Sequence, residues 1–293
     1  MRPLALARQI EACTGVQVEA FQKITRGWEN TVLEVNGEFI FRFPRFRANW
    51  KRFQKEISLL PLLSRELSVS VPRYEFIWEG SRKYPLKFAG YRKIAGASLS
   101  KGSFRRAWAH GLGGDLGRFL TQMHSIRPPP ILKKLVTEYT VKGWFDANLK
   151  FYRDTRRVVY PLLTRDEKKI AQEFWKDFFW RFGNHHYRPT LVHRDLTGGN
   201  LIVDSSKGRL NGVIDWADVS IADPAFDFAG LFEVNARLGE RALEVYGLPK
   251  EGFRERIDLY YRGIPFGEIA WGVKQKSDHW KELGLRHFRQ RLS

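Results

Sequence analysis

Residues 191–227 read LVHRDLTGGNLIVDSSKGRLNGVIDWADVSIADPAFD, and this stretch decides how the chain is organised. An apolar run leads to Asp195, and Asn200 follows five residues later. A strand-like run at 201–203, a Ser-Ser-Lys-Gly turn and a second strand-like run lead to Asp215. The pattern therefore predicts two acids and an amide at the ends of adjacent short strands.

Two acids and an amide in this arrangement are typical of phosphoryl transfer. We expect Asp195 to accept the proton of an acceptor hydroxyl and to orient that hydroxyl in line with a γ-phosphate. Asn200 and Asp215 would coordinate Mg²⁺, a hard cation that prefers oxygen ligands. The alternative is that these groups only cap loops at strand ends.

Neighbouring polar residues in this stretch suggest structural roles. We expect His193 to brace the loop through hydrogen bonds rather than to titrate in catalysis. Asp223 precedes Pro224 in the pattern of a helix N-terminus. Asp227 would lie in the first helical turn, where an acid favours the helix dipole, and could also brace the catalytic loop. Asp218 is interpreted as a surface acid, with a minor role near the metal as the alternative.

Composition limits the class of protein. The chain has 293 residues, 43% of them hydrophobic, which suits one large or two smaller globular domains. No apolar run approaches the roughly 20 residues that span a bilayer, so we expect no membrane partner. The single cysteine, Cys13, fits a reducing cytoplasm. A net charge of +18 favours anionic partners such as nucleotides, nucleic acid or a membrane surface.

A hairpin is predicted in the first part of the chain, at 31–43, where Asn36-Gly37 separates two alternating runs. A two-residue loop there places Leu33 opposite Ile40 and puts Arg42 on the same face. That face would suit a flat base with phosphates further along; the alternative is an ordinary half-exposed sheet face. The phenylalanines of the second strand would fill the core: Phe39, Phe41 and Phe43.

A helix follows at 48–66, and Glu56 flanks its apolar stripe. A carboxylate there needs a cation, and Arg42 is the candidate, because a kinase strand Lys pairs with a helix Glu in this order. A solvated helix Glu is the alternative. Pro61 is expected to end or kink the helix.

The remaining periodicity predicts two lobes that meet near Ile94–Ser98. Residues 1–95 would form an N-terminal lobe with an antiparallel sheet, strands at 17–25, 74–79 and 86–93, and a helix at 3–14. Residues 96–293 would form a mainly helical C-terminal lobe. Its expected helices are 104–125, 140–158, 165–182, 224–237, 239–246, 252–262, 266–275 and one from about 278.

With these motifs in place, the chain resembles the aminoglycoside phosphotransferase family, in the superfamily that holds choline kinases and shares the protein-kinase fold. The resemblance covers nearly the whole chain and is closest to the 2''-phosphotransferase branch, which has counterparts of VNGEFIFRFP (35–44) and PFGEIAWG (265–272). The other segments that carry it are Gly27-x-x-Asn30, FIFRFP at 39–44, KEISLLPLL at 55–63, YRKIAG at 91–96, LTQMH at 120–124, HRDLTGGN at 193–200 and IDWADVSIADPAFDFA at 214–229.

The resemblance implies a bilobal α+β fold and Mg²⁺-dependent transfer of phosphate from ATP or GTP. It implies that Asp195 is the base, that Asn200 and Asp215 hold Mg²⁺, and that Arg42, paired with Glu56, holds the α/β-phosphates. The backbone around Arg92–Ile94 would meet the purine edge, with Leu33 and Ile40 above the base.

The chain departs from the kinase pattern at several places. It has no G-x-G-x-x-G, and only Gly27 serves the nucleotide loop. Arg42 stands where a protein kinase has Lys, but Arg can still grip phosphate. Trp216-Ala217 follows Asp215, so no switching of the protein-kinase kind is expected.

The acceptor is expected to be an aminoglycoside-type antibiotic or a related sugar-containing compound. Such polycations need acidic contacts, and the C-terminal region offers Glu233, Glu240, Glu244 and Glu268, with Trp271 to stack on a sugar. Solvated helix residues and a core aromatic are the alternative. Because the chain is strongly basic, a choline-like or sugar-like acceptor remains a second possibility.

Two other classes compete with the kinase interpretation. A nucleic-acid-binding protein would use the net charge and the cations interleaved with aromatics at 42–53, but strand, loop and helix patterns explain that stretch as well. The second class is a degenerate kinase-like binding module, and intact Asp195, Asn200 and Asp215 argue against it. We expect a cytoplasmic monomer whose partners are a nucleoside triphosphate and a small hydroxyl acceptor, with no nucleic acid.

Overall fold

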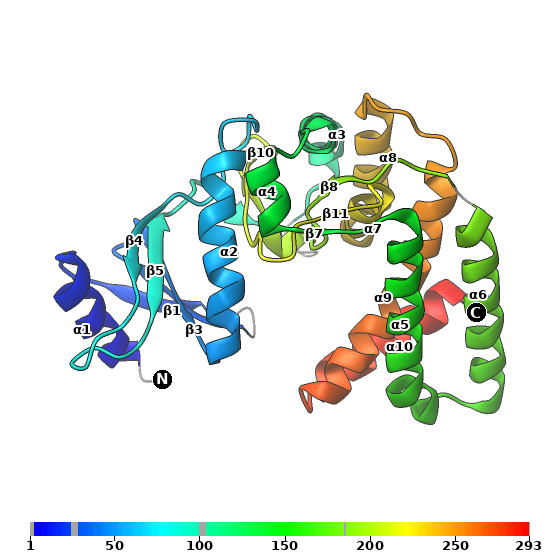
Figure 1. Ribbon diagram of the computed structural model, residues 1–293, viewed down its shortest axis with the longest axis horizontal. Coiled ribbons are helices and arrows are strands. Elements are labelled where there is room, and N and C mark those ends of the chain that lie inside the picture. The colour runs from blue at the N-terminus through cyan, green and yellow to red at the C-terminus, as the bar shows by residue number, and fades with distance from the viewer. Residues whose placement is uncertain (1–2, 25–28, 100–103, 185, 293) are drawn as a thin grey trace.

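An antiparallel sheet of five strands forms the first part of the computed structural model (Figure 1), which describes residues 3–24, 29–99, 104–184 and 186–292. The strand order in the sheet is β1-β2-β3-β5-β4. The helix α1 lies on one side of this sheet and α2 on the side that faces the rest of the molecule (Figure 1). Their bounds are α1 Pro3–Thr14, β1 Phe21–Ile24, β2 Asn30–Val35, β3 Phe39–Pro44, α2 Arg47–Leu63, β4 Tyr74–Trp78 and β5 Phe88–Arg92.

The outer face of the sheet forms a core with α1, as the phenylalanine pattern predicted. Phe39, Phe41 and Phe43 are buried together with Leu6 and Ile10 of the helix. Burial of each such side chain stabilises the fold by ~1.5–3 kcal/mol. Gly90 on β5 makes room for this core, because a Cβ at that position would collide with the ring of Phe41.

The predicted register of the β2–β3 hairpin is wrong by one residue. The loop holds Asn36, Gly37 and also Glu38, so that Val35 lies opposite Phe39. The Glu38 N–H closes the turn on the Val35 oxygen at 3.0 Å, and its carbonyl accepts from the Lys93 N–H at 2.7 Å. Asn36 and Gly37 both have a left-handed φ, 53° and 69°, and Glu38 completes a three-residue loop before β3 begins at Phe39.

This shift removes Leu33 from the predicted nucleotide face. Leu33 lies opposite Phe41 and is buried in the core with α1. A one-residue slip moves a side chain to the other face of a sheet. The face toward α2 therefore carries Ile40 and Arg42, as predicted, but with Val32 in place of Leu33.

The helix α2 joins the sheet to the larger core. It ends at Leu63 instead of residue 66, with Pro61 in its last turn. Its first half packs Trp50 and Phe53 against Ala89 of β5. Its second half places Leu59, Leu60 and Leu63 in the main core of the C-terminal part.

Two small sheets in the described C-terminal part hold the segments that decided the fold. One has the order β10-β9-β6, and the other has the order β7-β11-β8. Both lie between the N-terminal sheet and the long helices (Figure 1). Their bounds are β6 Ala97–Ser98, β7 Thr137–Glu138, β8 Thr190–Val192, β9 Leu201–Asp204, β10 Arg209–Val213 and β11 Ser220–Ala222.

Helices make up most of the remaining chain, as expected for the C-terminal lobe. The α-helices are α3 Ala109–Ser125, α4 Pro130–Leu135, α5 Val141–Val159, α6 Arg165–Asn184, α7 Ala225–Val234, α8 Ala236–Val245, α9 Phe253–Lys274 and α10 Asp278–Leu292. Short 3₁₀ turns are η1 Arg106–Trp108, η2 Tyr160–Leu162 and η3 Gly198–Asn200. None of the helices in the described ranges is long and apolar enough to cross a membrane.

The two helices predicted at 252–262 and 266–275 are one helix, α9. Pro265 lies inside it and lacks the N–H that would bond the carbonyl of Tyr261. The Arg291 guanidinium of α10 donates to that carbonyl at 3.1 Å. A contact from a distant helix thus replaces the missing hydrogen bond, which lets the helix continue through the proline.

The fold is α+β, with an antiparallel N-terminal sheet and a mainly helical remainder, as predicted. The boundary at residue 95 stays a prediction. Residue 95 lies between β5, in the five-stranded sheet, and β6, in the sheet of order β10-β9-β6.

Candidate active site

Asp227, in the first turn of α7, binds the start of the loop between β8 and β9. Its two oxygens accept the backbone N–H groups of His193 and Arg194, each at 2.8 Å. His124 of α3 lies 3.2 Å from the same carboxylate. Burial opposes ionisation of Asp227, but the hydrogen bond to His124 and the other contacts leave its pKa lowered. The carboxylate therefore stays charged and fixes the start of the loop.

His193 braces the loop, as predicted. Its buried ring packs on Trp216, its Nε2 lies 3.2 Å from the Ile214 carbonyl, and its Nδ1 accepts the Asp195 N–H at 3.3 Å. Burial lowers the pKa of His193. A neutral ring with its proton on Nε2 satisfies both contacts, so this histidine positions Asp195 without changing charge.

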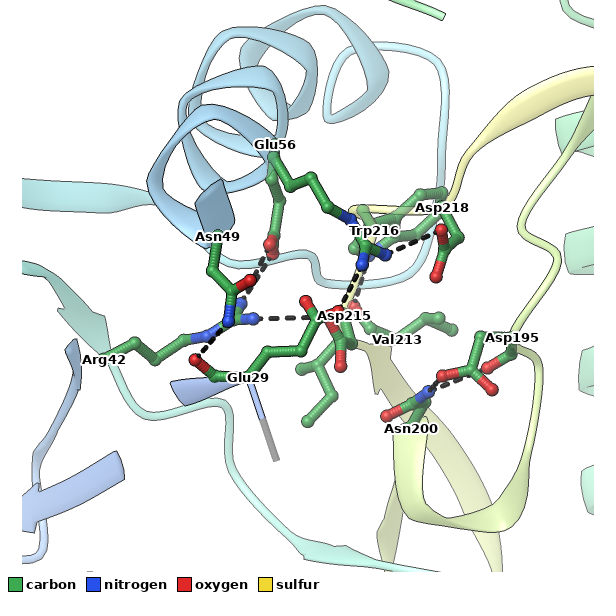
Figure 2. A network of polar contacts seen from close by, with 12 residues as sticks. Glu29, Arg42, Asn49, Glu56, Asp195, Asn200, Val213, Asp215, Trp216 and Asp218 are labelled. Atoms are coloured by element: carbon green, nitrogen blue, oxygen red, sulfur yellow. Dashed lines mark hydrogen bonds and ion pairs between the residues drawn. The ribbon is translucent and has the colours of Figure 1, made fainter. Parts of the chain in front are cut away.

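Asp195 is oriented by Asn200 across the loop (Figure 2). The Asn200 amide nitrogen donates to the backbone oxygen and to Oδ2 of Asp195, both at 2.8 Å. Burial and, next, the nearby charge of Asp215 raise the pKa of Asp195 to about 7. A carboxylate with a pKa near neutrality is suited to accept and release a proton.

Asn200 and Asp215 fit a divalent cation. Because the Asn200 amide nitrogen donates to Asp195, the side-chain carbonyl oxygen of Asn200 remains available to bind the cation. The Ile214 N–H donates to the Asn200 backbone oxygen at 3.0 Å, which joins the two segments. The Asp215 side chain is 45% exposed, and its backbone has a left-handed φ of 65°. Such strain in a non-glycine residue is common at functional sites.

The predicted pair of Arg42 and Glu56 is present and buried. Arg42 Nη1 lies 2.8 and 3.0 Å from the two carboxylate oxygens of Glu56. Tyr74 supports both, because it accepts from Arg42 at 2.9 Å and donates to Glu56 at 3.0 Å. Burial raises the pKa of Glu56, and the guanidinium opposes that rise. The second nitrogen of Arg42 reaches Asp215 at 3.2 Å, so the pair faces the predicted metal ligand (Figure 2).

Two further cations of α2 hold the loop after Asp215. The Lys55 ammonium donates to the carbonyls of Ala217 and Val219 at 3.1 and 2.8 Å. Arg52 pairs with Asp218 at 2.7 Å. We did not predict these contacts. Their signal was the i, i+3, i+4 spacing of Arg52, Lys55 and Glu56, which places three charges on one side of the helix.

Asp218 is therefore a half-exposed acid with an arginine partner, in agreement with its interpretation as a surface acid. Arg52 also pairs with Glu29, ahead of β2. Gly27, assigned to the nucleotide loop, lies outside the described residues.

The other predicted nucleotide contacts are arranged as follows. Ile40 lies on the face of Arg42, opposite Tyr91 of β5. The Arg92 side chain turns to the outer face, where it pairs with Glu38, so only its backbone faces the connection between the lobes. Ile94 packs near Gly212 of β10. The contacts of these residues with a purine stay predictions.

Two of the predicted acceptor residues are brought together. Glu233 of α7 and Glu268 of α9 form a cluster with His287 of α10, their ligand atoms all within 4.8 Å of one another. His287 lies 2.7 Å from Glu268, and Arg291 pairs with Glu233. Lys274 lies 5.7 Å from the centre of the Trp271 ring.

Glu240 and Glu244 of α8 do not join them. Each has its own arginine, Arg254 and Arg241 respectively. The single acidic patch that the sequence suggested is thus divided, and three of its members, Glu233, Glu240 and Glu244, are paired with arginines.

Comparisons with known proteins identify the same architecture. A family model described as the phosphotransferase enzyme family, APH, matches residues 20–258. Viomycin phosphotransferase from Streptomyces vinaceus is 38% identical over 146 residues, which are 48% of this chain and 49% of that protein. The chain thus matches about half the length of that curated relative.

Solved structures agree in fold. The GDP complex of aminoglycoside 2'-phosphotransferase-IIIa superposes with a TM-score of 0.85 at 22% identity, over 99% of this chain and 98% of that chain. Macrolide 2'-phosphotransferase MphH from Brachybacterium faecium has a TM-score of 0.74 at 18% identity, over 97% of each chain. The family model covers most of the sequence, so this chain belongs to the phosphotransferase enzyme family.

Proposed function

We propose that this protein transfers the γ-phosphoryl group of a nucleoside triphosphate to a hydroxyl group of a small molecule. The observation that carries this proposal is the contact between Asn200 and Asp195, which sets a carboxylate with a pKa of about 7 beside two oxygen ligands for a cation. Family membership supports the same class of reaction.

Each residue of the site has a role in that reaction. Asp195 accepts the proton of the acceptor hydroxyl and directs its oxygen toward the γ-phosphorus. Arg42, held in place by Glu56, contacts the α- and β-phosphates, and its charge offsets the charge of the leaving diphosphate. Asn200 and Asp215 would hold Mg²⁺, which when bound neutralises phosphate charge. Asp227 and His193 keep the loop in the conformation that aims Asp195.

The acceptor is proposed to be an antibiotic with a sugar or related hydroxyl. Viomycin phosphotransferase is similar over half of this chain, and one solved relative is described as a GDP and kanamycin complex. The Glu233–Glu268 cluster and Trp271 remain the proposed contacts for a cationic acceptor. The proposed phosphate donor is ATP or GTP. The proposed location is the cytoplasm, which the single cysteine predicts and where these nucleotides are present.

An assay of phosphate transfer tests the proposal. Purified protein is incubated with Mg²⁺, radiolabelled ATP or GTP, and separate acceptors: viomycin, kanamycin, gentamicin, streptomycin, a macrolide and choline. Asp195→Asn is expected to reduce kcat by at least about 10³-fold where one acceptor is modified. Asp258→Asn, the same change on an exposed helix face, is the matched control. Failure to bind either nucleotide and to label any acceptor would overturn the proposal.

A further inference from the structure

A second concave site lies at the junction of α5 and α6, formed by the end of one helix, the η2 turn and the start of the next. Its cavity has a volume of about 570 Å³. The lining is strongly basic and aromatic: Tyr152, Arg153, Arg156, Arg157, Tyr160, Pro161 and Lys168. We refer to it as the basic pocket.

The basic pocket is separate from the active site. The first turn of α5 lies next to the catalytic loop, where Trp144 packs 5.2 Å from the Arg194 guanidinium. Arg156 is twelve residues further along the same helix, or ~18 Å at 1.5 Å per residue. Figure 1 shows the connection from α5 to α6 at the end of the helical region away from the small sheets. A ligand of the basic pocket would therefore not touch Asp195 or Asp215.

The cations of the basic pocket have no carboxylate partner among the described residues, although acids are present on the same helices. Asp154 forms an ion pair with Lys150. Arg157 interacts with Asp154 only through its charge at longer range, where it helps to lower the pKa of that carboxyl group. On α6, Asp166 pairs with Lys169 at 3.7 Å, and Glu167 pairs with Arg289 of α10 at 2.8 Å. The acids around the pocket are thus engaged elsewhere, which leaves its positive charge uncompensated.

Tyr160 and Tyr152 form the aromatic part of the lining of the basic pocket. Tyr160 is only 8% exposed, and its hydroxyl lies close to Tyr152. The Arg156 guanidinium lies 5.3 Å from the centre of the same ring. This contact holds one of the four cations of the basic pocket against its aromatic lining.

We propose that the basic pocket binds a phosphorylated small molecule. Guanidinium groups form paired hydrogen bonds with phosphate oxygens, and three arginines and a lysine converge here. The volume falls within the range of about 300–1,000 Å³ typical of small-molecule sites. The concave shape favours a compact ligand over a nucleic-acid strand, which follows an extended groove. This inference does not depend on the proposed phosphotransferase activity.

Calorimetric titration with inorganic tripolyphosphate tests the proposal in the full-length protein. The wild type is expected to show two binding sites, one in the active site and one in the basic pocket. Arg156→Glu/Arg157→Glu should lose one of them, with affinity reduced at least tenfold and the nucleotide KM unchanged. Arg82→Glu/Lys83→Glu, which changes the net charge equally on the exposed turn after β4, should keep both. Equal titrations of the wild type and the pocket variant would refute the proposal, whereas a single wild-type site that the pocket variant loses would support the basic pocket and contradict tripolyphosphate binding in the active site.

Two further measurements separate this role from others. Lys168→Gln removes one of the four cations of the basic pocket, so the pocket should bind tripolyphosphate several-fold more weakly while the melting temperature is unchanged. A loss of stability without a loss of binding would show a structural role only. A single-stranded oligoribonucleotide should bind the wild type and the pocket variant alike. Binding of that strand that depends on Arg156 and Arg157, without a second tripolyphosphate site, would assign the surface to nucleic acid instead.

Discussion

The side-chain amide of Asn200 donates to Asp195 twice, to the backbone oxygen and to Oδ2, at 2.8 Å in both cases. One amide thereby holds the proposed base and presents its own oxygen toward the position of the cation. Both roles depend on the same orientation of the Asn200 side chain. A substitution of Asn200 should therefore affect the base and the cation site together.

Asn200→Asp should therefore damage catalysis although it keeps an oxygen ligand. The change removes the donor to Asp195 and adds a third carboxylate beside Asp195 and Asp215, so we expect kcat to fall by about 10²–10³-fold. The apparent pKa of the base should rise as well, because like charges disfavour ionisation. Steady-state kinetics across pH would check both effects, and an unchanged pH profile would contradict the inferred contact.

The raised pKa of Asp195 predicts the pH dependence of the reaction. The base must be ionised, and burial with the charge of Asp215 raises its pKa to about 7. Because kcat/KM reports the free enzyme, it should fall on the acid side with a midpoint near pH 7. A midpoint near pH 4, the ordinary range of Asp, would show that Asp195 is not the titrating base.

The same pKa predicts a stability effect. A carboxyl group whose pKa is raised on folding binds its proton more tightly in the native state, so its contribution to stability is lost as pH rises from about 4 to about 7. Asp195→Asn should thus stabilise the protein at pH 8 by roughly 2–4 kcal/mol relative to pH 4. Urea unfolding of the metal-free protein at both pH values measures this difference, and Asp258→Asn should show almost none.

The pair of Arg42 and Glu56 should be strongly coupled in stability. Arg42→Met leaves the buried Glu56 carboxylate without its cation, and Glu56→Leu leaves the buried Arg42 guanidinium with only its contact to the more exposed Asp215. Each change should cost about 3–5 kcal/mol, whereas the double variant should cost much less than the sum. A double-mutant cycle from urea unfolding gives the coupling free energy. The exposed pair of Arg254 and Glu240 is the matched comparison, with a coupling below about 1 kcal/mol. Equal couplings for the two pairs would refute the buried geometry.

Lys55→Met should weaken the use of the metal. The ammonium holds the carbonyls of Ala217 and Val219, directly after the proposed ligand Asp215. Without it the loop is less well positioned, so we expect the Mg²⁺ concentration for half-maximal activity to rise about tenfold, with the nucleotide KM little changed. Lys51→Met, on the exposed side of the same helix, is the control. An effect on the nucleotide KM alone would assign Lys55 to nucleotide binding.

The sequence predicted much of the site because its residues are close together in the chain. Asp195 and Asn200 share one loop, and Arg42 and Glu56 follow each other on a strand and a helix with characteristic spacing. The ion pair of Arg42 and Glu56 could be predicted from their order in the chain and from the free-energy cost of burying an unpaired acid.

The errors came from contacts between distant segments. The register of Leu33 is set by the pairing of β3 with both β2 and the distant strand β5, and not by the Asn-Gly turn alone. The continuity of α9 through Pro265 depended on Arg291, which follows it by 26 residues. The hydrogen bonds from Lys55 to the loop after Asp215 likewise depend on how α2 packs in the folded protein.

The position of α2 has a consequence for how the molecule would come apart. Its leucines at 59, 60 and 63 belong to the main core, while its first half belongs to the sheet that precedes residue 95. A cut in the connection after β5 would therefore sever the backbone without freeing a self-sufficient fragment, because each piece would expose part of a shared interior. We expect heating to melt the whole chain in one step, and separately expressed halves to remain insoluble unless they are produced together.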